Sequence, residues 1–360
     1  MKIRVLCAAA LAAITLASCS KDDGANLIVP DGRPAKLSIS IKDPVMTRAT
    51  GGPSSTDNVV KTFTVWVFDA AGKLLAQETS ANDANSIEDI DVTTSAKEAY
   101  VIANCDNTNV TGINSKAALL NFIGTLDDTA DQSARRWATG SDLALSFTPT
   151  GAGGSYEGSS NIALSFIAAR ITVKIINNMT GYDAANTDGH LVLKKVTVLN
   201  GGHNTKLFGT TLVPDPMRWI SGIQNDSFGF WPASNITAGS SLLINDIAAD
   251  DFTTTYHYYV FENKATAADE FPTIVTLVGE FDGKLTYFPV HLTPYEMFST
   301  GSVDNGVERG HSYNITITLS TDPGTGGGGE PDPTKPVERA KFDVEISIND
   351  WIPVTLGKEF

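Results

Sequence analysis

Apolar and polar residues alternate along many short stretches of this chain, with the period of two that is typical of half-buried β-strands. In the first such stretch Leu37, Ile39 and Ile41 are apolar, and polar residues stand between them. The other expected strands cover residues 59–68, 73–77, 87–92, 99–103, 143–147, 162–176, 191–199, 241–247, 256–262, 273–281, 285–292 and 312–319. Short strands at this spacing, with Gly, Asn, Asp or Pro between them, indicate β-sandwiches rather than a parallel α/β sheet.

Helical patterns are few and short. Residues 115–123 and 128–137 are the best candidates for helices, since each begins with a residue suited to cap a helix. Residues 150–161 are rich in glycine and serine and are expected to form a loop, after which residues 162–176 are expected to close a first domain. The predicted fold is all-β, with two transthyretin-like β-sandwich domains in tandem and a few short helices.

A glycine- and proline-rich stretch precedes one last expected strand. It includes four successive glycines, Gly326 to Gly329, which supply no side chains to a core and favour a hinge. In the strand that follows, apolar residues again occupy every second position; they are Phe342, Val344, Ile346 and Ile348. This strand is therefore predicted to be strongly amphipathic and able to leave its own domain.

The N-terminus has the features of an export signal. Lys2 and Arg4 precede an apolar run over residues 5–16 that is too short to cross a bilayer as a helix. The run ends in Leu-Ala-Ser-Cys, which resembles a lipobox; its cysteine, Cys19, would take a lipid and become the new N-terminus. An ordinary signal peptide that ends by chance near a cysteine is the alternative, and this tetrapeptide disfavours it.

Charge and cysteine usage narrow the class of protein. The formal net charge of −15 disfavours nucleic acid or a bare anionic membrane as a partner. Cys7 is removed with the signal peptide and Cys19 would carry the lipid, so Cys105 is the one thiol left in the folded part. A single cysteine can form neither an internal disulfide nor a zinc or redox site of the Cys-x-x-Cys kind.

The sequence lacks the patterns of common enzymes. It contains no Gly-x-Ser-x-Gly elbow, no phosphate-binding glycine loop and no His-Glu-x-x-His pair, and its five histidines have no ligand-like spacing. Adjacent carboxylates such as Asp250-Asp251 lie in turn-like segments, where solvated acids are more common than glycosidase pairs. Asp128-Thr129-Ala130 resembles a short acceptor for bacterial O-glycosylation, although a tripeptide has low specificity. We therefore expect no enzyme, no cofactor and no metal.

Several segments, in their order along the chain, resemble the Bacteroidales fimbrillins that build type V pili. The lipobox comes first, and the Lys-Asp-Asp behind it is similar to the signal that moves Bacteroidales lipoproteins to the outer face of the outer membrane. The strands that carry the resemblance are Val65-Trp66-Val67-Phe68-Asp69, Tyr100-Val101-Ile102-Ala103-Asn104, Ala169-Arg170-Ile171-Thr172-Val173, Tyr258-Tyr259-Val260-Phe261-Glu262-Asn263 and Val307-Glu308-Arg309-Gly310-His311-Ser312-Tyr313, with Trp351 near the end. The resemblance covers nearly the whole chain and is closest to the major, stalk-type subunits. Gly310 departs from the asparagine that the family commonly has there.

The resemblance implies an assembly route. The lipidated precursor reaches the cell surface, and an arginine-specific protease removes the N-terminal strand around Ile39. The vacated groove then accepts the C-terminal strand of the next subunit. Arg48 matches the cleavage position, with Ala49 as the first mature residue, because it follows the first strand and precedes the second. Arg33 is the competing site, but a cut before the strand would leave the groove filled.

The expected layout follows from these features. The segments are a lipoprotein signal peptide (1–18), a propeptide with the first strand (19–48), two β-sandwich domains (49–178 and 179–321), a linker (322–337) and a donor strand (338–360). The expected partners are other copies of the chain, related fimbrial subunits, the protease and a host or bacterial surface receptor. The chain would first be an outer-membrane lipoprotein and then part of an extracellular fimbrium that contributes to adhesion.

Two functions from different classes stay open on these grounds. One is a polymerising structural subunit, and the other is a monomeric surface lipoprotein that keeps its lipid and binds a glycan or a protein. The tail favours the first function, since a binding lipoprotein has no need of a glycine-rich hinge followed by an amphipathic strand. Within the first class, an accessory or tip adhesin is an alternative to a stalk subunit.

Overall fold

A computed structural model describes the chain in a series of segments. They are residues 32–42, 59–105, 110, 112–126, 137–151, 154–179, 183, 185, 191–209, 218–223, 236–248, 252–264, 271–292 and 306–319, and the backbone of 343–350. Within these segments no helix is long and apolar enough to cross a membrane. Nor do three His, Cys, Asp or Glu side chains gather in them as a metal site would require.

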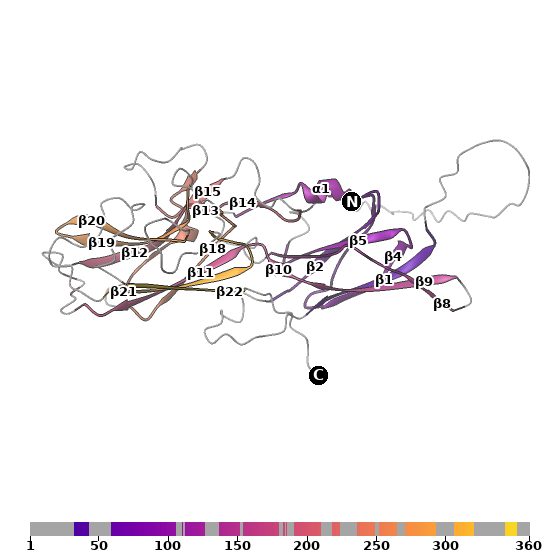
Figure 1. The fold of residues 1–360 in the computed structure, drawn as a ribbon, viewed down its shortest axis with the longest axis horizontal. Coiled ribbons are helices and arrows are strands. Elements are labelled where there is room, and N and C mark those ends of the chain that lie inside the picture. The colour runs from indigo at the N-terminus through magenta and orange to yellow at the C-terminus, as the bar shows by residue number, and fades with distance from the viewer. Residues whose placement is uncertain are drawn as a thin grey trace, which may run out of the picture. The chain divides into compact units, whose positions relative to one another are not determined.

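The first part of the described chain forms two facing β-sheets (Figure 1). One sheet has the strand order β4-β1-β9-β8, and the other has the order β10-β7-β5-β2-β3. The strands are β1 (Pro34–Lys42), β2 (Phe63–Asp69), β3 (Leu74–Thr79), β4 (Ser86–Thr93), β5 (Ala96–Ala103), β7 (Ala138–Asp142), β8 (Thr148–Thr150), β9 (Ser155–Ala163) and β10 (Ser165–Phe166). Leu37 of one sheet and Val65 of the other are fully buried in one hydrophobic cluster, so the sheets pack face to face.

The second part of the described chain forms a second pair of sheets, and each sheet of this pair has four strands. Their orders are β18-β11-β21-β22 and β17-β12-β19-β20, and a smaller sheet has the order β13-β15-β16. The strands are β11 (Ala169–Asn177), β12 (Val192–Leu199), β13 (Gly201–Gly202), β15 (Trp219–Ser221), β16 (Ile236–Ala238), β17 (Ile244–Asp246), β18 (Thr255–Val260), β19 (Ile274–Phe281), β20 (Lys284–His291), β21 (His311–Leu319) and β22 (Asp343–Asp350). A short 3-10 helix, η2 (Ser241–Leu243), precedes β17. The predicted all-β fold of tandem sandwiches is confirmed.

A hydrogen bond between buried groups connects the two larger sheets of the second sandwich. The hydroxyl of Tyr258 in β18 donates to the backbone oxygen of Val196 in β12, with 2.9 Å between the oxygens. Tyr258 is fully buried, and burial raises the pKa of its phenol because the charged form would lose its hydration. A buried phenol needs such an acceptor, so this bond fixes how the two sheets meet.

Strand β11 corrects the predicted end of the first domain. The alternation over residues 162–176 predicted a strand that closes the first domain at residue 178. The strand exists, but β11 pairs antiparallel with β18 and parallel with β21, both in the second sandwich. Alternation reveals that a segment is a strand and which of its residues share a face; it does not reveal which strands lie beside it.

Two further expectations around β9 are wrong. Residues 143–147 were expected to form a strand but lie between β7 and β8, and residues 150–161 were expected to be a loop but contribute most of β9. The glycine that weakened the strand signal has a packing reason, because a Cβ on Gly158 would lie 2.9 Å from the ring of Phe147. Strand β9 therefore owes its conformation to its neighbours rather than to its own composition.

One of the two expected helices is confirmed. Helix α1 (Lys116–Leu120) begins after Ser115, whose hydroxyl oxygen accepts a hydrogen bond of 3.2 Å from the amide of Ala118. It buries Leu119 in the first sandwich. The helix expected over residues 128–137 lies outside the described residues except for its last position.

A short two-stranded sheet joins residues from the two sandwiches. β6 (Ile123–Thr125) pairs antiparallel with β14 (Asn204–Lys206). Just beyond β14, the ring of Phe208 meets the ring of Tyr100 edge to face, with 5.1 Å between centroids. The segment that begins at β14 is therefore held by both sandwiches.

The position of β1 predicts a large effect of a small truncation. Leu37→Ala should lower the free energy of unfolding of the uncleaved protein by about 2–5 kcal/mol, because Leu37 is fully buried between two paired strands. The matched control is Leu285→Ala in β20, where the leucine is 59% exposed; there we expect a change within about 0.5 kcal/mol. Urea denaturation of both variants measures the difference, and equal midpoints would contradict the assigned burial of β1.

Candidate assembly site

Strand β1 lies inside its sheet, with a neighbour on each side. It pairs antiparallel with β4 and parallel with β9, and Figure 1 shows it between them. Among the described strands β1 is also the first in the sequence, so no other described strand would be detached together with it. Removal of β1 would open a groove between β4 and β9, with a row of unpaired backbone groups on each wall.

Four side chains of β1 point into the core at every second position. Their exposed fractions are 6% for Ala35, 0% for Leu37, 0% for Ile39 and 4% for Ile41. The three predicted positions are thus brought together, and the structure adds Ala35 at the start of the row. Burial of the three large side chains is worth about 4.5–9 kcal/mol.

The opposite face of β1 makes polar contacts with β4. The ammonium of Lys36 lies 2.8 Å from a carboxylate oxygen of Asp91, its cross-strand neighbour, and donates 3.2 Å to the backbone oxygen of Asp89. The hydrogen bond to Asp91 raises the pKa of Lys36. Opposite Ser38, β4 has a bulge, and within it Asp89 has a φ of 59°, a left-handed conformation that aspartate tolerates.

The backbone just before β1 is also paired. The amide of Arg33 donates to the hydroxyl of Thr94, and its backbone oxygen accepts from the amide of Thr94, with lengths of 3.0 and 2.9 Å. Its guanidinium donates to the hydroxyl of Tyr156 over 2.6 Å. The competing cleavage site therefore lies on hydrogen-bonded backbone, which a protease cannot bind in extended form without local unfolding.

Strand β22 has a different position in its sheet. It pairs antiparallel with β21 from the pair His311↔Asp350 to the pair Thr318↔Asp343. In the strand order β18-β11-β21-β22 it stands last, so one described strand holds it, whereas two hold β1. The predicted donor positions Val344, Ile346 and Ile348 lie on this strand.

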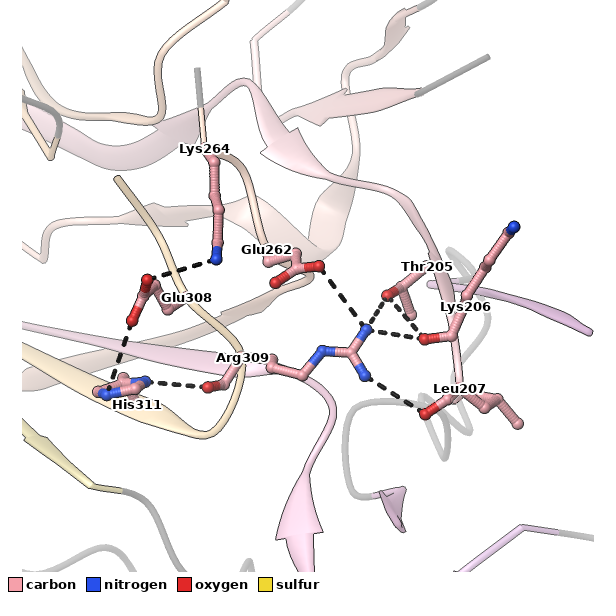
Figure 2. A network of polar contacts seen from close by, with 8 residues as sticks. All are labelled: Thr205, Lys206, Leu207, Glu262, Lys264, Glu308, Arg309 and His311. Atoms are coloured by element: carbon pink, nitrogen blue, oxygen red, sulfur yellow. Dashed lines mark hydrogen bonds and ion pairs between the residues drawn. The ribbon is translucent and has the colours of Figure 1, made fainter. Parts of the chain in front are cut away.

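A cluster of polar contacts fixes the turn that leads into β21. Figure 2 shows Arg309 reaching to the segment at β14, where its guanidinium donates to the hydroxyl of Thr205 over 2.6 Å and to the backbone oxygen of Lys206 over 2.7 Å. A longer contact of 3.4 Å leads to the backbone oxygen of Leu207. A planar guanidinium suits this role because it can serve several acceptors at once.

Two opposite charges in this cluster, those of Arg309 and Glu262, are largely removed from water. A carboxylate oxygen of Glu262, a residue that is 4% exposed, lies 3.8 Å from the guanidinium of Arg309. Burial lowers the pKa of Arg309, and Glu262 opposes this shift by favouring the charged form. Beside it, Glu308 lies 3.4 Å from the ammonium of Lys264 and 4.0 Å from the imidazole of His311.

A buried phenol completes the turn. The hydroxyl of Tyr313 donates to the backbone oxygen of Gly306 over 3.1 Å and accepts from the amide of Glu308 over 2.7 Å. Burial raises the pKa of Tyr313 from 10.0 to about 12. The stabilising effect of its neutral form is therefore complete below pH 10.0 and is lost as the pH rises toward about 12.

The structure describes only part of the predicted site. Cys19, Arg48, Ala49 and Phe342 lie outside the described residues. The sequence reasoning missed two features: Ala35, which continues the period of two, and the contacts of Arg309. Alternation could have revealed the first, whereas no sequence pattern signals that Arg309 binds backbone oxygens about a hundred residues earlier.

Comparison with known families identifies the class of protein. The description "FimA-like major fimbrial subunit protein, C-terminal domain" matches residues 168–351, slightly more than half of the 360-residue chain. The description "Major fimbrial subunit protein (FimA)" matches residues 35–143. Both matches are to subunits of bacterial fimbriae. The chain belongs to the family of FimA-like major fimbrial subunit proteins.

Solved structures with the same fold include proteins from two organisms. A candidate cell adhesion protein from Bacteroides eggerthii has a TM-score of 0.69 at 23% identity, over 89% of this chain and 97% of that one. A fimbrilin (FimA) from Porphyromonas gingivalis has a TM-score of 0.65 at 19% identity, over 89% and 99% of the two chains. The tip fimbrial protein Mfa3 from the same organism, with a C-terminal truncation, reaches 0.52 at 14% identity, over 89% and 100%. A search of curated protein sequences found no match.

The contacts of Arg309 predict a strong dependence of stability on this side chain. Arg309→Ala should lower the free energy of unfolding by about 3–5 kcal/mol, because Glu262 stays buried without its cation and three oxygens lose a donor. The control is Arg218→Ala, since Arg218 is exposed and should tolerate truncation with a change within about 0.5 kcal/mol. Urea denaturation compares the two variants. If Arg309→Ala unfolds at the midpoint of Arg218→Ala, the cluster has no stabilising role.

Proposed function

We propose that this fimbrial subunit polymerises by strand exchange after proteolysis, and that it builds the shaft of a surface pilus of the type V kind, which contributes to adhesion. In this mechanism an arginine-specific protease cuts after Arg48 and β1 leaves. The C-terminal strand of a second copy, or of a related subunit, then enters the groove between β4 and β9. The linker 322–337 and the donor segment 338–360 are parts of the same proposal.

The place of β1 in the sheet is the observation that carries the proposal. β1 is the first described strand, yet it forms ladders with both neighbours and buries a row of apolar side chains. A cut between residues 42 and 59 would disconnect it from the rest of the chain without touching another described strand. Few strands in a sandwich can be detached by one cut and still leave a complete acceptor for another strand.

The balance of free energy favours exchange after the cut. β1 contributes three large apolar side chains, whereas the C-terminal segment offers Phe342, Val344, Ile346 and Ile348, worth about 6–12 kcal/mol if buried. In its own subunit β22 pairs with one of the described strands, and in the groove it would pair with two. Before the cut, the covalent tether keeps β1 at a high local concentration and excludes the competitor.

Arg48 fits the cleavage site better than Arg33. Both backbone groups of Arg33 are hydrogen-bonded to Thr94, which hinders its entry into a protease. Arg48 stands in a sequence rich in threonine, glycine, serine and proline, a composition typical of accessible segments. A cut after Arg33 would also leave β1 attached to the mature chain.

The exchange would produce a filament. Each subunit gives its C-terminal strand and receives another one at a different surface, so the contact is head to tail and does not close on itself. The four glycines Gly326 to Gly329 would let the donor strand leave its own domain. The precursor would reach the outer face of the outer membrane through a lipid on Cys19 and lose that anchor with the propeptide.

Intact mass and N-terminal sequencing of the protein from the native cell surface test the proposal as a whole. We expect a mature chain that begins at Ala49 and carries no lipid. A chain that begins at a lipidated Cys19 would instead identify an anchored monomeric lipoprotein and overturn strand exchange after proteolysis.

The cleavage step predicts a defect of one arginine variant. Arg48→Ala should accumulate a longer chain that does not polymerise, because β1 stays covalently attached and fills the groove. Arg33→Ala is the matched control and should mature and polymerise normally. Electron microscopy for pili and the chain length on denaturing gels measure both steps. Normal pili from Arg48→Ala would place the cut elsewhere or make it unnecessary.

The donor strand predicts that one buried charge stops assembly. Ile346→Asp should give a folded and cleaved monomer without filaments, since an unpaired carboxylate in the groove costs several kcal/mol. Deletion of residues 342–360 should have the same result. Ser347→Asp is the matched control, because neighbouring residues of a strand point to opposite faces. Filaments from the deletion variant would refute the role of this strand as the donor.

A further inference from the structure

We propose that the incoming donor strand enters the groove in one register, with Ala340 at the place of Ala35 and Lys341 at the place of Lys36. The inference rests on the proposed strand exchange and adds which residues of the partner copy meet which residues of β4 and β9. It also assigns a selective role to the acidic side of the groove, where Asp91 and Asp89 of β4 contact Lys36 of β1.

The sequences of the two strands carry the same order of residue types. β1 reads Ala-Lys-Leu-Ser-Ile-Ser-Ile over residues 35–41, and the donor segment reads Ala-Lys-Phe-Asp-Val-Glu-Ile over residues 340–346. In both, a small residue and a lysine precede three large apolar residues at alternate positions. The shared direction of this order implies that the donor runs parallel to β9 and antiparallel to β4, as β1 does.

The acidic side of the groove has one cation from β1. The ammonium of Lys36 lies 2.8 Å from Asp91 and 3.2 Å from the backbone oxygen of Asp89, and Glu78 also favours its charged form. Cleavage after Arg48 removes this lysine together with β1 and leaves the carboxylates without it. A donor in the proposed register returns a lysine, Lys341, to the same place.

A register shifted by two residues is the competing arrangement. It would also bury four apolar residues, from Phe342 to Ile348, but it puts Asp343 where Lys36 stood, directly opposite Asp91. Like charges at directly opposed positions destabilise a strand pair. The shifted register therefore replaces an attraction at the acidic side by a repulsion.

The size of the first buried position also distinguishes the two registers. Ala35 is nearly inaccessible, and its partners across the two ladders are Val92 and Tyr156. Ala340 would fill this position without change, whereas the shifted register would put the ring of Phe342 there and overpack it. In the proposed register the phenylalanine replaces Leu37, a residue of comparable size whose neighbour on β9 is a glycine.

Two features favour the shifted register. The first is that it buries four large apolar residues, Ile348 included, whereas the proposed register buries three of them and Ala340. The second is that it keeps a serine, Ser347, at the place of Ser40, whose hydroxyl donates to the backbone oxygen of Ser160. The bond is 3.4 Å long, which makes it weak. Together these two features do not outweigh two penalties of the shifted register, which are the repulsion between Asp343 and Asp91 and the aromatic ring of Phe342 in the site of Ala35.

The register implies what kind of strand the groove selects. An acceptable donor needs a small residue and then a cation immediately before its first large apolar residue. A strand of equal hydrophobicity with an acid at that place would lie opposite the carboxylate of Asp91. The partner that fits is thus a second copy of this chain or a subunit with the same order of residues.

Pairs of introduced cysteines can test the register directly. Opposed residues of an antiparallel pair have Cα atoms about 4.5–5.5 Å apart, which a disulfide can bridge. Asp91→Cys combined with Lys341→Cys should therefore give a ladder of disulfide-linked subunits after protease treatment and oxidation of the full chain. Asp91→Cys combined with Asp343→Cys should give filaments without a ladder, and each single variant serves as a control. The side chain of Asp91 is 87% exposed, so its substitution should not disturb folding.

Each result of this experiment decides a separate question. A ladder from the pair with Asp343→Cys and none from the pair with Lys341→Cys would overturn the register and leave strand exchange intact. Filaments from both pairs without a ladder from either would do the same. Absence of filaments from the protease-treated parent chain would overturn strand exchange itself and the register with it. The expected ladder supports both.

Reversal of charge tests the selective role of the acidic side. Lys341→Glu should reduce the extent of assembly at limiting subunit concentration about two- to five-fold, the range typical of exposed ion pairs. Asp91→Lys in the same chain should restore most of this loss, and 0.5 M salt should reduce the difference. Equal assembly of the parent and Lys341→Glu at low salt would show that the acidic side does not select the donor.

Discussion

The paired ladders on both sides of β1 are the interaction on which the rest of the first sandwich depends. An interior strand satisfies its own backbone and also one edge of each neighbour, so its loss exposes two rows of hydrogen-bonding groups and one row of apolar contacts. The parallel ladder to β9 and the antiparallel ladder to β4 make β1 such a strand. The same feature that stabilises the intact chain would, under the proposed mechanism, make the cleaved subunit an acceptor.

Alternation in the sequence predicted most strands because burial of one face imposes a period of two. It located β1, β4, β12 and β19 to within about two residues. It failed at β9, where Gly158 and the surrounding serines suppress the pattern and where the strand conformation comes from pairing with β1. It could not show that β11 belongs to the second sandwich, because pairing between distant segments leaves no periodic trace. For the site, alternation found the apolar row of β1 but neither Ala35 nor the contact of Lys36 with Asp91.

The contacts of Arg309 and the contacts of Lys36 differ in kind. Arg309 is largely buried, serves three oxygens and faces the buried Glu262, so the local fold depends on its presence. Lys36 lies at the surface opposite an exposed carboxylate, and such a pair contributes little to stability. A weak contact can still discriminate, because specificity depends on the difference between a matched and a mismatched partner. At the position opposite Asp91, the attraction of a lysine and the repulsion of an aspartate both increase that difference.

Burial of apolar side chains alone would not define the register of the incoming strand in the proposed exchange. The groove and the donor both carry apolar residues at every second position, so a slip by two residues keeps four apolar side chains inside and exchanges Ala340 for Ile348. Buried apolar area therefore supplies the driving force, but it does not select the proposed register. The register has to come from positions where the two strands are not uniform, which in β1 are the small Ala35 at one end of the row and Lys36 beside it. An opposed charge and a site too small for a ring act at short range, and for this reason they can exclude an alignment that hydrophobic burial alone would allow.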